Sequence, residues 1–274
     1  MLSQRLLSAA VLLPLFLATA IAGDPWYSLA AGLVAALAYF EFHRMMVQGG
    51  HSPLLVAGIA FCLLFVANAF LQAHGMGDNT AAILAGAVVV PLVQLIGRPT
   101  QKGVAEAWAL TLAGSLYSGW LFSLFVLLRN LPQGLSWVLV TVLTTFACDS
   151  AAYLVGRAWG KHRMVPHLSP GKTWEGAIGG FLAAVTAAGL INFILGAYVP
   201  SLAPPLVLAQ ALVLGGLVGI TAQLGDLSES LLKRSVHAKD AGGIIPGHGG
   251  VLDRIDSLLF SGAAVYFFSR FLIS

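Results

Sequence analysis

Charged residues are scarce in this sequence. Asp, Glu, Lys and Arg together make up 9% of the 274 residues, whereas an ordinary soluble domain contains about 25%. Hydrophobic residues account for 58% of the chain. So few charges cannot cover the water-facing surface of a globular domain of this length. The composition therefore excludes an ordinary soluble protein.

Cysteine is equally scarce. The chain contains two cysteines, Cys62 and Cys148, and both lie inside apolar runs. Neither belongs to a Cys-x-x-Cys or Cys/His ligand pattern, and no pair of histidines has the spacing of a zinc site. We therefore expect two buried free thiols, no disulfide and no zinc.

Long apolar runs, in contrast, are frequent. A helix needs about 20 mostly apolar residues to cross the hydrocarbon core of a bilayer, and the runs here have helical length without the alternation of barrel strands. Nine runs are bounded by charge, Gly or Pro: 6–22, 26–41, 53–73, 80–97, 106–128, 134–153, 176–198, 205–224 and 252–273. We predict an all-α polytopic integral membrane protein with about nine transmembrane helices. The first run could pass for a signal peptide, but the many runs after it favour a retained span.

The basic residues are distributed unevenly over the expected connections. With a cytoplasmic amino terminus, every Lys and Arg except Arg129 and Arg270 falls in or beside a cytoplasmic segment. This is a strong positive-inside signal. We divide the chain into amino-terminal transmembrane helices, 1–130, and a carboxy-terminal catalytic region, 131–274.

The first polar segment begins where the sixth run ends. It contains two acidic residues and several basic, hydroxyl and aromatic side chains: Asp149, Tyr153, Arg157, Lys161, Arg163, Ser169, Lys172, Thr173 and Glu175. Gly171-Lys172-Thr173 is similar to the end of a P-loop, but Pro166 stands where that motif needs Gly, and no strand is predicted before it. Lys172 remains a candidate for phosphate contact.

Two simpler interpretations of this segment stay open. Arg157, Lys161 and Arg163 would suffice to bind anionic lipid headgroups. Ser169 or Thr173 can cap a new helix whose first turn contains Glu175.

The second polar segment is richer in carboxylates. On a helix, Asp226, Glu229 and Lys233 lie at positions i, i+3 and i+7, and therefore on one face. Asp253 and Asp256 repeat the i, i+3 spacing. Two such helix ends can meet around a hard cation, because magnesium takes oxygen ligands and leaves positions open for phosphate. Simple interfacial ion pairs, such as Asp226 with Lys233, are the alternative.

A glycine-rich loop connects these two helix ends. Five glycines lie between Gly242 and Gly250, and they allow close backbone approach and amide groups that face an anion. Lys239 and Arg254 flank the loop. His248 could cap a helix, pair with a carboxylate or contact phosphate.

The residues from Ser230 to Asp256 resemble the signature of the phosphatidate cytidylyltransferases, also called CDP-diacylglycerol synthases. The matching elements are Ser230, Lys233-Arg234, Lys239-Asp240, His248-Gly249-Gly250 and Asp253-Arg254-Ile255-Asp256. The Asp149–Arg157 and Ser169–Gly176 stretches also resemble this family. The resemblance implies an all-helical membrane enzyme. We expect it in the bacterial inner membrane, and the distribution of basic residues predicts that its active site is on the cytoplasmic face.

This resemblance also implies the reaction and its cofactors. CTP and phosphatidic acid would react to give CDP-diacylglycerol and pyrophosphate, with Mg²⁺ as the cofactor and K⁺ as a candidate for a second cation. No nucleic acid is expected as a partner, and a homodimer is conceivable.

The resemblance assigns roles to individual residues. Metal ligands would be Asp226 and Asp253, then Asp256 and Glu229. Catalytic residues would be Asp226, Lys233, Arg234, Lys239, Asp240, His248, Asp253, Arg254 and Asp256. Substrate contacts would come from Asp149, Tyr153, Arg157, Ser169, Lys172, Thr173, Glu175, Ser230, Gly249 and Gly250.

Two other functions remain as alternatives. A CTP-dependent polyprenol or phytol kinase would share nucleotide-binding residues but transfer the γ-phosphate. A secondary transporter is expected to place ionisable residues near the middle of the membrane, and none falls clearly at the centre of a predicted span here.

Overall fold

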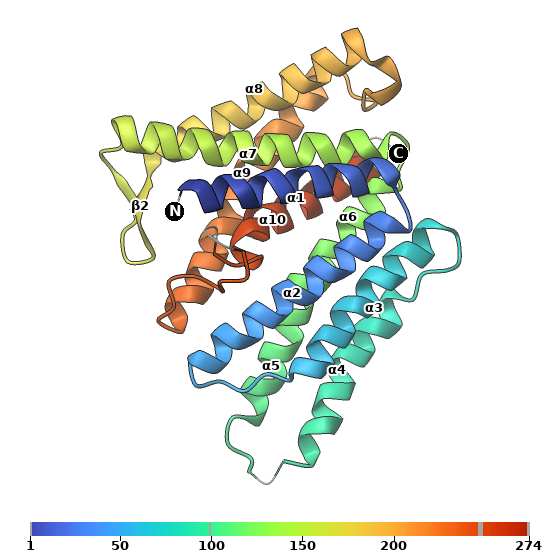
Figure 1. The fold of residues 1–274 in the computed structure, drawn as a ribbon, viewed down its shortest axis with the longest axis vertical. Helices are drawn as coiled ribbons and strands as arrows, with labels where there is room; N and C mark the ends of the chain where they lie inside the picture. The colour runs from blue at the N-terminus through green and yellow to red at the C-terminus, as the bar shows by residue number, and fades with distance from the viewer. Residues whose placement is uncertain (1, 99, 246–248, 273–274) are drawn as a thin grey trace. The chain divides into compact units, whose positions relative to one another are not determined.

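The computed structural model describes residues 2–98, 100–245 and 249–272, which are mainly helical (Figure 1). The α-helices are α1 (Leu2–Ala22), α2 (Trp26–Gln48), α3 (Leu55–Ala73), α4 (Thr80–Ile96), α5 (Val104–Ser115), α6 (Leu121–Arg129), α7 (Gly134–Trp159), α8 (Trp174–Tyr198), α9 (Leu208–Ser235) and α10 (Leu252–Leu272). A π-helical turn, Leu116–Trp120, joins α5 to α6, and a 3-10 turn, Pro200–Leu202, follows α8.

Each of the nine predicted runs coincides with a helical segment, but several helices continue beyond the apolar residues. Helix α2 extends to Gln48, α7 to Trp159 and α9 to Ser235. An apolar run ends at its first charge, whereas backbone hydrogen bonding continues until a residue that ends the helix, such as Gly49 after α2 or Gly160 after α7. Polar residues near the ends of the runs are therefore helical.

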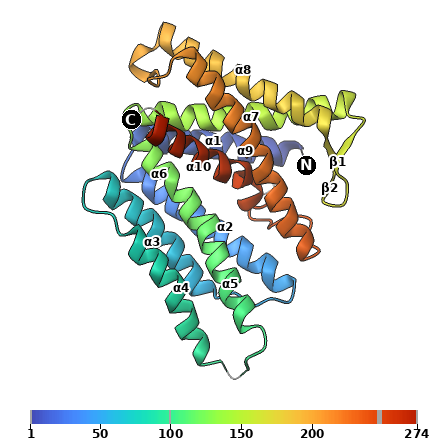
Figure 2. The same ribbon diagram turned by 180° about the vertical axis from the view of Figure 1, so that it is seen from behind.

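A short β-hairpin, which the sequence did not lead us to expect, lies between α7 and α8. Strands β1 (Arg163–Val165) and β2 (Ser169–Thr173) pair antiparallel, with Arg163 opposite Thr173 (Figure 2). The all-α prediction therefore holds for the helices but misses these two strands. The hairpin leads directly into Trp174, the first residue of α8.

Five helical segments among the described residues are long and apolar enough to cross a membrane: Leu55–Ala73, Val104–Arg129, Gly134–Trp159, Trp174–Tyr198 and Leu208–Ser235. Two shorter apolar helical segments are Ala10–Ala22 and Thr80–Ile96. Large apolar side chains such as Val93, Ile178 and Leu182 are exposed on these helices. Such surfaces suit lipid rather than water, so the protein is a helical membrane protein.

The chain forms two compact units. The first comprises Met1–Leu127 and Lys233–Ile255. Its core includes Phe61, Phe65 and Ala87 from α3 and α4. At the start of α3, Tyr39 Oη donates a hydrogen bond to the Leu54 carbonyl oxygen at 2.9 Å, and the Leu54 N–H donates to Thr111 Oγ1 at 2.8 Å. These bonds connect α2, α3 and α5.

The second unit comprises Leu128–Leu232 and Asp256–Ser274. Small residues form the contact between its helices: Cys148 of α7, Ala184 of α8 and Ala222 of α9 are fully buried together. Small side chains let membrane helices approach closely. Cys148 and Cys62 are both buried free thiols, as predicted. The proposed division of the chain near residue 130 stays a prediction.

Candidate active site

The start of α10 is held against the glycine-rich loop by Asp253. Its carboxylate oxygens accept hydrogen bonds from the Ala241 N–H at 3.1 Å and the Gly250 N–H at 2.9 Å. Gly249, just before, has a φ of +83°, a backbone conformation that favours glycine. Asp253 therefore contacts both ends of the loop.

Asp253 also forms an ion pair with Lys233 near the end of α9. The Lys233 Nζ lies 2.8 Å from Asp253 Oδ1, and the two side chains are 13% and 7% exposed. At this burial, water and salt screen the interaction of the two charges only weakly, and loss of one partner would leave a buried charge without its counterion. The structure thus brings together two of the predicted catalytic residues.

Other predicted catalytic residues around this loop are exposed. Arg234, Lys239, Asp240 and Arg254 all lie at the surface. The Arg234 guanidinium donates to the Ala238 carbonyl oxygen at 3.0 Å, which closes the turn after α9. His248 lies outside the described residues, and its role stays a prediction.

In the second unit, Lys172 of β2 pairs with Asp226 of α9. The Lys172 Nζ lies 2.8 Å from Asp226 Oδ2, with side chains 23% and 39% exposed. Thus the two polar segments of the sequence, widely separated along the chain, meet at this pair. The sequence left open a pairing of Asp226 with Lys233, whereas in the structure Lys233 pairs with Asp253.

Thr173 and Glu175 have the local roles that the capping interpretation predicted. Thr173 precedes α8, and its Oγ1 accepts a hydrogen bond from the Gly176 N–H at 3.1 Å. Glu175 lies in the first turn of α8, where its carboxylate accepts the N–H groups of Lys161 and His162 and contacts His162 Nδ1 at 2.6 Å. These contacts fasten the hairpin to the helix. Substrate contact by Thr173 and Glu175 stays a prediction.

The remaining predicted substrate residues of this unit lie on α7 and β2. The Arg157 guanidinium donates to Tyr153 Oη at 3.1 Å, one turn away on α7. Asp149 lies half-buried on the same helix, and Ser169 begins β2. Their contact with substrate also stays a prediction.

Helices α9 and α10 approach each other at Gly225 and Asp256. A Cβ at Gly225 would overlap the backbone carbonyl of Asp256, so glycine permits this close approach directly before Asp226. Asp256 is 9% exposed, and its Oδ1 accepts the Ser257 N–H at 2.7 Å. Glu229 and Ser230, farther along α9, are buried.

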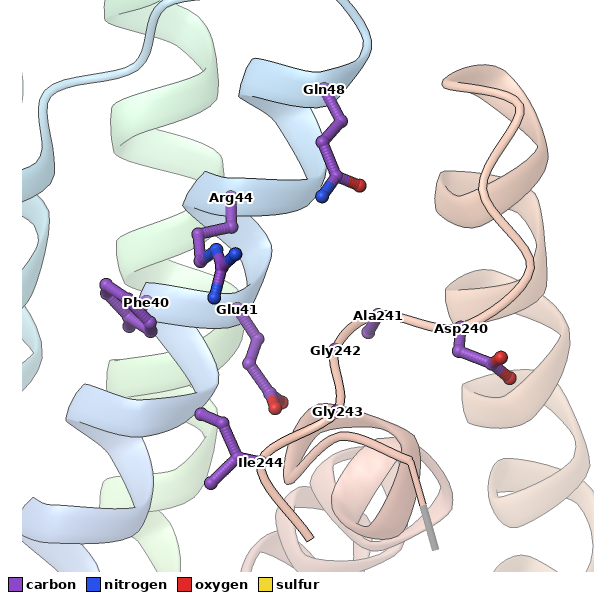
Figure 3. A pocket seen from close by; sticks show the side chains of 9 residues that line it. All are labelled: Phe40, Glu41, Arg44, Gln48, Asp240, Ala241, Gly242, Gly243 and Ile244. Atoms are coloured by element: carbon purple, nitrogen blue, oxygen red, sulfur yellow. The ribbon is translucent and has the colours of Figure 1, made fainter. Parts of the chain in front are cut away.

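Sequence reasoning missed one acidic residue of the first unit, Glu41. It is the last residue of the predicted run 26–41, but it lies within α2 and is only 1% exposed. It borders a cavity of about 210 Å³ between α2 and the loop, into which Arg44 and Gln48 also extend (Figure 3). A lone carboxylate in an apolar run was the available signal.

The carboxylates present have the donor chemistry of a magnesium site. Among the residues that the structure describes, no three His, Cys, Asp or Glu side chains form a metal-binding group. Magnesium is commonly held by one or two carboxylates together with substrate phosphates and water. Asp253 in the first unit, and Asp226 and Asp256 in the second, therefore offer oxygen donors that fit this chemistry without such a group. Bound Mg²⁺ and K⁺ stay predictions.

The fold and these contacts define a helical membrane protein with aspartate–lysine pairs at the ends of its apolar helices, of which Lys233 with Asp253 lies beside a glycine-rich loop. Comparison with known proteins identifies its relatives. Residues 3–272 match the Cytidylyltransferase family, and the chain belongs to this family.

Several similar proteins are named phosphatidate cytidylyltransferase. The chain is 32% identical over 268 residues to that of Bacillus subtilis (strain 168), which covers 96% of both chains. It is 31% identical to the protein of Synechocystis sp. over 97% of this chain and 96% of the relative. It is 38% identical to the Brucella melitensis protein over 70% of this chain and 67% of the relative.

Proposed function

We infer that this protein transfers the cytidylyl group of CTP to phosphatidic acid and releases pyrophosphate, which yields CDP-diacylglycerol for phospholipid synthesis. The observation that carries this conclusion is the match to the family over residues 3–272, which includes both polar segments. Relatives that align over nearly their whole length are named for this activity. The apolar helices suit a lipid substrate that stays in the bilayer.

In the proposed reaction, a phosphate oxygen of phosphatidic acid attacks the α-phosphorus of CTP, and pyrophosphate leaves. Both reactants are anionic, so the protein must position them and neutralise their charge. The lysines of the two ion pairs, Lys233 and Lys172, are suited to this task because each ammonium group can exchange an aspartate oxygen for a phosphate oxygen. Arg234, Lys239 and Arg254 would supply further positive charge at the surface.

The phosphate nucleophile already carries negative charge near neutral pH, so the reaction needs no strong general base. His248 therefore need not remove a proton, and no covalent intermediate with the protein is required. Binding and orientation remain as the main contributions of the side chains.

We propose that Asp226 and Asp253 ligate magnesium, with Asp256 and Glu229 as further oxygen donors. When bound, the ion would neutralise charge on the phosphates of CTP. The aspartates would keep their oxygens oriented through existing contacts, such as the bonds from Ala241 and Gly250 to Asp253. A monovalent ion such as K⁺ is a further proposal.

The finer topology is also a proposal. Nine spans with a cytoplasmic amino terminus would place both polar segments on the cytoplasmic face of the inner membrane, where CTP is present. Support comes from the basic residues, which fall almost entirely on one side in this arrangement. A homodimer is compatible with this arrangement.

The decisive experiment uses CTP labelled at two positions. Purified protein is incubated with phosphatidic acid, magnesium and CTP that carries label at either the α- or the γ-phosphate, and the lipid is then extracted. We expect α-label in the lipid and γ-label in pyrophosphate. A γ-label in the lipid, with CDP as the other product, would instead identify a lipid kinase.

Two controls accompany this assay. Omission of phosphatidic acid should abolish lipid labelling. The Glu106→Gln variant should retain it, because Glu106 is half-exposed and its ion pair with His51 lies outside both polar segments of the sequence. Uptake of a solute into proteoliposomes without any turnover of CTP would contradict the enzymatic function and support a transporter.

A further inference from the structure

Glu41 is a buried acid in a part of the chain without a recognised motif. It lies in α2 and is 1% exposed. A carboxylate that folding removes from water needs hydrogen-bond donors in compensation. Its contacts therefore indicate what it does.

The Glu41 carboxylate contacts the glycine-rich loop and the start of α10. Its Oε2 accepts a hydrogen bond from the Leu252 N–H at 2.9 Å. Leu252 is the first residue of α10, where N–H groups lack partners within the helix and favour a negative charge. Figure 3 shows the Glu41 carboxylate pointing from α2 toward Gly243 and Ile244 of the loop.

Two glycines make room for this carboxylate. A Cβ at Gly242 would overlap Glu41 Oε1, and a Cβ at Gly250 would overlap Oε2. Neither glycine has a positive φ, so space rather than backbone conformation explains why a side chain is excluded there. Glu41 therefore packs against the backbone at both ends of the loop.

Asp253, which follows the loop in the sequence, also contacts both of its ends. It accepts the N–H groups of Ala241, which precedes Gly242, and of Gly250, which Glu41 also contacts. Its other partner is Lys233. Both ends of the loop are thus in contact with one carboxylate from α2 and one from α10.

We propose that Glu41 is a positioning residue: it fixes the backbone at Gly242 and at Gly250–Leu252, and so sets the orientation of Asp253 and its contact with Lys233. This inference rests on the proposed function, in which Asp253 and Lys233 act on the substrates. Displacement of a catalytic group by about 1 Å can lower a rate about a hundredfold. Through these contacts of Glu41, which we call the Glu41 clamp, the amino-terminal half of the chain contributes to the reaction.

The first test compares three substitutions at this position. Gln keeps the length and one acceptor oxygen, whereas Asp is one methylene shorter and Ala removes the acceptor. We expect Glu41→Ala and Glu41→Asp to lower kcat about tenfold or more, with the KM for CTP changed less than about threefold, because orientation rather than affinity is lost. Glu41→Gln should keep kcat within about threefold of wild type by the same reasoning.

Hydrogen exchange at the Leu252 amide supplies a readout that does not depend on turnover. Glu41→Ala should speed this exchange, whereas the Glu106→Gln control should leave both exchange and activity unchanged. A Glu41→Ala protein with wild-type kcat, or a Glu41→Gln protein as impaired as the alanine variant, would overturn the proposal.

The second test leaves Glu41 in place and serves if its substitution prevents folding. An added methyl at Gly242 meets the Glu41 carboxylate, whereas one at the neighbouring Gly243 meets nothing within 4 Å. Gly242→Ala should therefore lower kcat and speed exchange at Leu252, while Gly243→Ala should leave this exchange unchanged. Equal rates of hydrogen exchange at Leu252 in the two variants would refute the proposal that the Glu41 clamp fixes the loop.

These outcomes are separable from those of the proposed function. If the wild-type protein forms no CDP-lipid, the proposed function fails, yet the exchange rates still report whether Glu41 fixes the loop. If CDP-lipid forms but all Glu41 variants turn over normally, only the positioning role fails.

Discussion

The buried pair of Lys233 and Asp253 yields the most informative perturbation. Asp253→Asn preserves the shape of the side chain but removes the charge that faces Lys233 Nζ at 2.8 Å. The Asn side chain also has an NH₂ group where Asp253 has an acceptor oxygen. This NH₂ group would face one of the three groups that donate to Asp253: Lys233 Nζ, the Ala241 N–H or the Gly250 N–H. Both stability and activity should therefore fall.

The size of the stability loss follows from burial. The two side chains are 13% and 7% exposed, so the range for a broken buried pair applies, about 3–5 kcal/mol. At about 2–4 °C per kcal/mol, the thermal unfolding midpoint should fall by roughly 6–20 °C. The partly exposed pair of Glu106 and His51 is the matched control, and Glu106→Gln should cost about 1 kcal/mol or less.

A double variant separates the folding role of the pair from its chemical role. Lys233→Met with Asp253→Asn removes both charges, and the Asn oxygen can still accept a backbone N–H. Because replacement of a buried pair by uncharged groups is often neutral, we expect stability within about 1 kcal/mol of wild type. Formation of CDP-lipid should stay at least about a hundredfold below wild type, since both groups would act on the substrates.

Unfolding is measured as the loss of folded protein on heating in detergent. Activity is measured as the formation of α-labelled lipid at equal amounts of folded protein. A double variant that regained activity together with stability would refute the reasoning, because the pair would then serve folding alone. Unchanged stability of Asp253→Asn would refute the contacts themselves.

Three further predictions concern other contacts. Lys172→Met should lower CDP-lipid formation about a hundredfold or more. It should reduce stability by less than about 1 kcal/mol, because the pair of Lys172 with Asp226 is partly exposed. The labelled-lipid assay and the melting curves described above measure both effects. Thr173→Ala should cost about 1 kcal/mol through loss of the cap on α8, seen as a lower melting midpoint that Thr173→Ser avoids. Hydrogen bonds from Thr80 hold the pKa of Asp78 below its usual value of 3.8. The resulting stabilisation is complete above pH 3.8 and is lost as the pH falls through the lower pKa of the folded state. The melting midpoints of wild type and Asp78→Asn should therefore converge in acid.

Contrary results would be equally clear for these three. A fully active Lys172→Met protein would remove Lys172 from phosphate binding. Equal melting of Thr173→Ala and Thr173→Ser would show that the cap contributes nothing. A constant difference between wild type and Asp78→Asn at all pH values would contradict the lowered pKa of Asp78.

The sequence alone determined the membrane class and the positions of the helices. Scarce charge and long apolar runs leave few alternatives to membrane helices, because backbone groups in lipid must pair within the segment. The spacing of Asp226 and Glu229 predicted a shared helix face, and both residues lie on α9. The signature from Ser230 to Asp256 pointed to the family in which the chain is now placed.

Only the tertiary structure decided which charges meet. Spacing along a helix left Asp226 with Lys233 as a possible pair, whereas the fold pairs Asp226 with Lys172 and Lys233 with Asp253. Contacts between residues far apart in the chain depend on how helices and loops pack, which no local pattern encodes. The same reason explains Glu41: its sequence neighbours are apolar, and its role became visible only where α2 meets the glycine-rich loop, more than two hundred residues later in the chain.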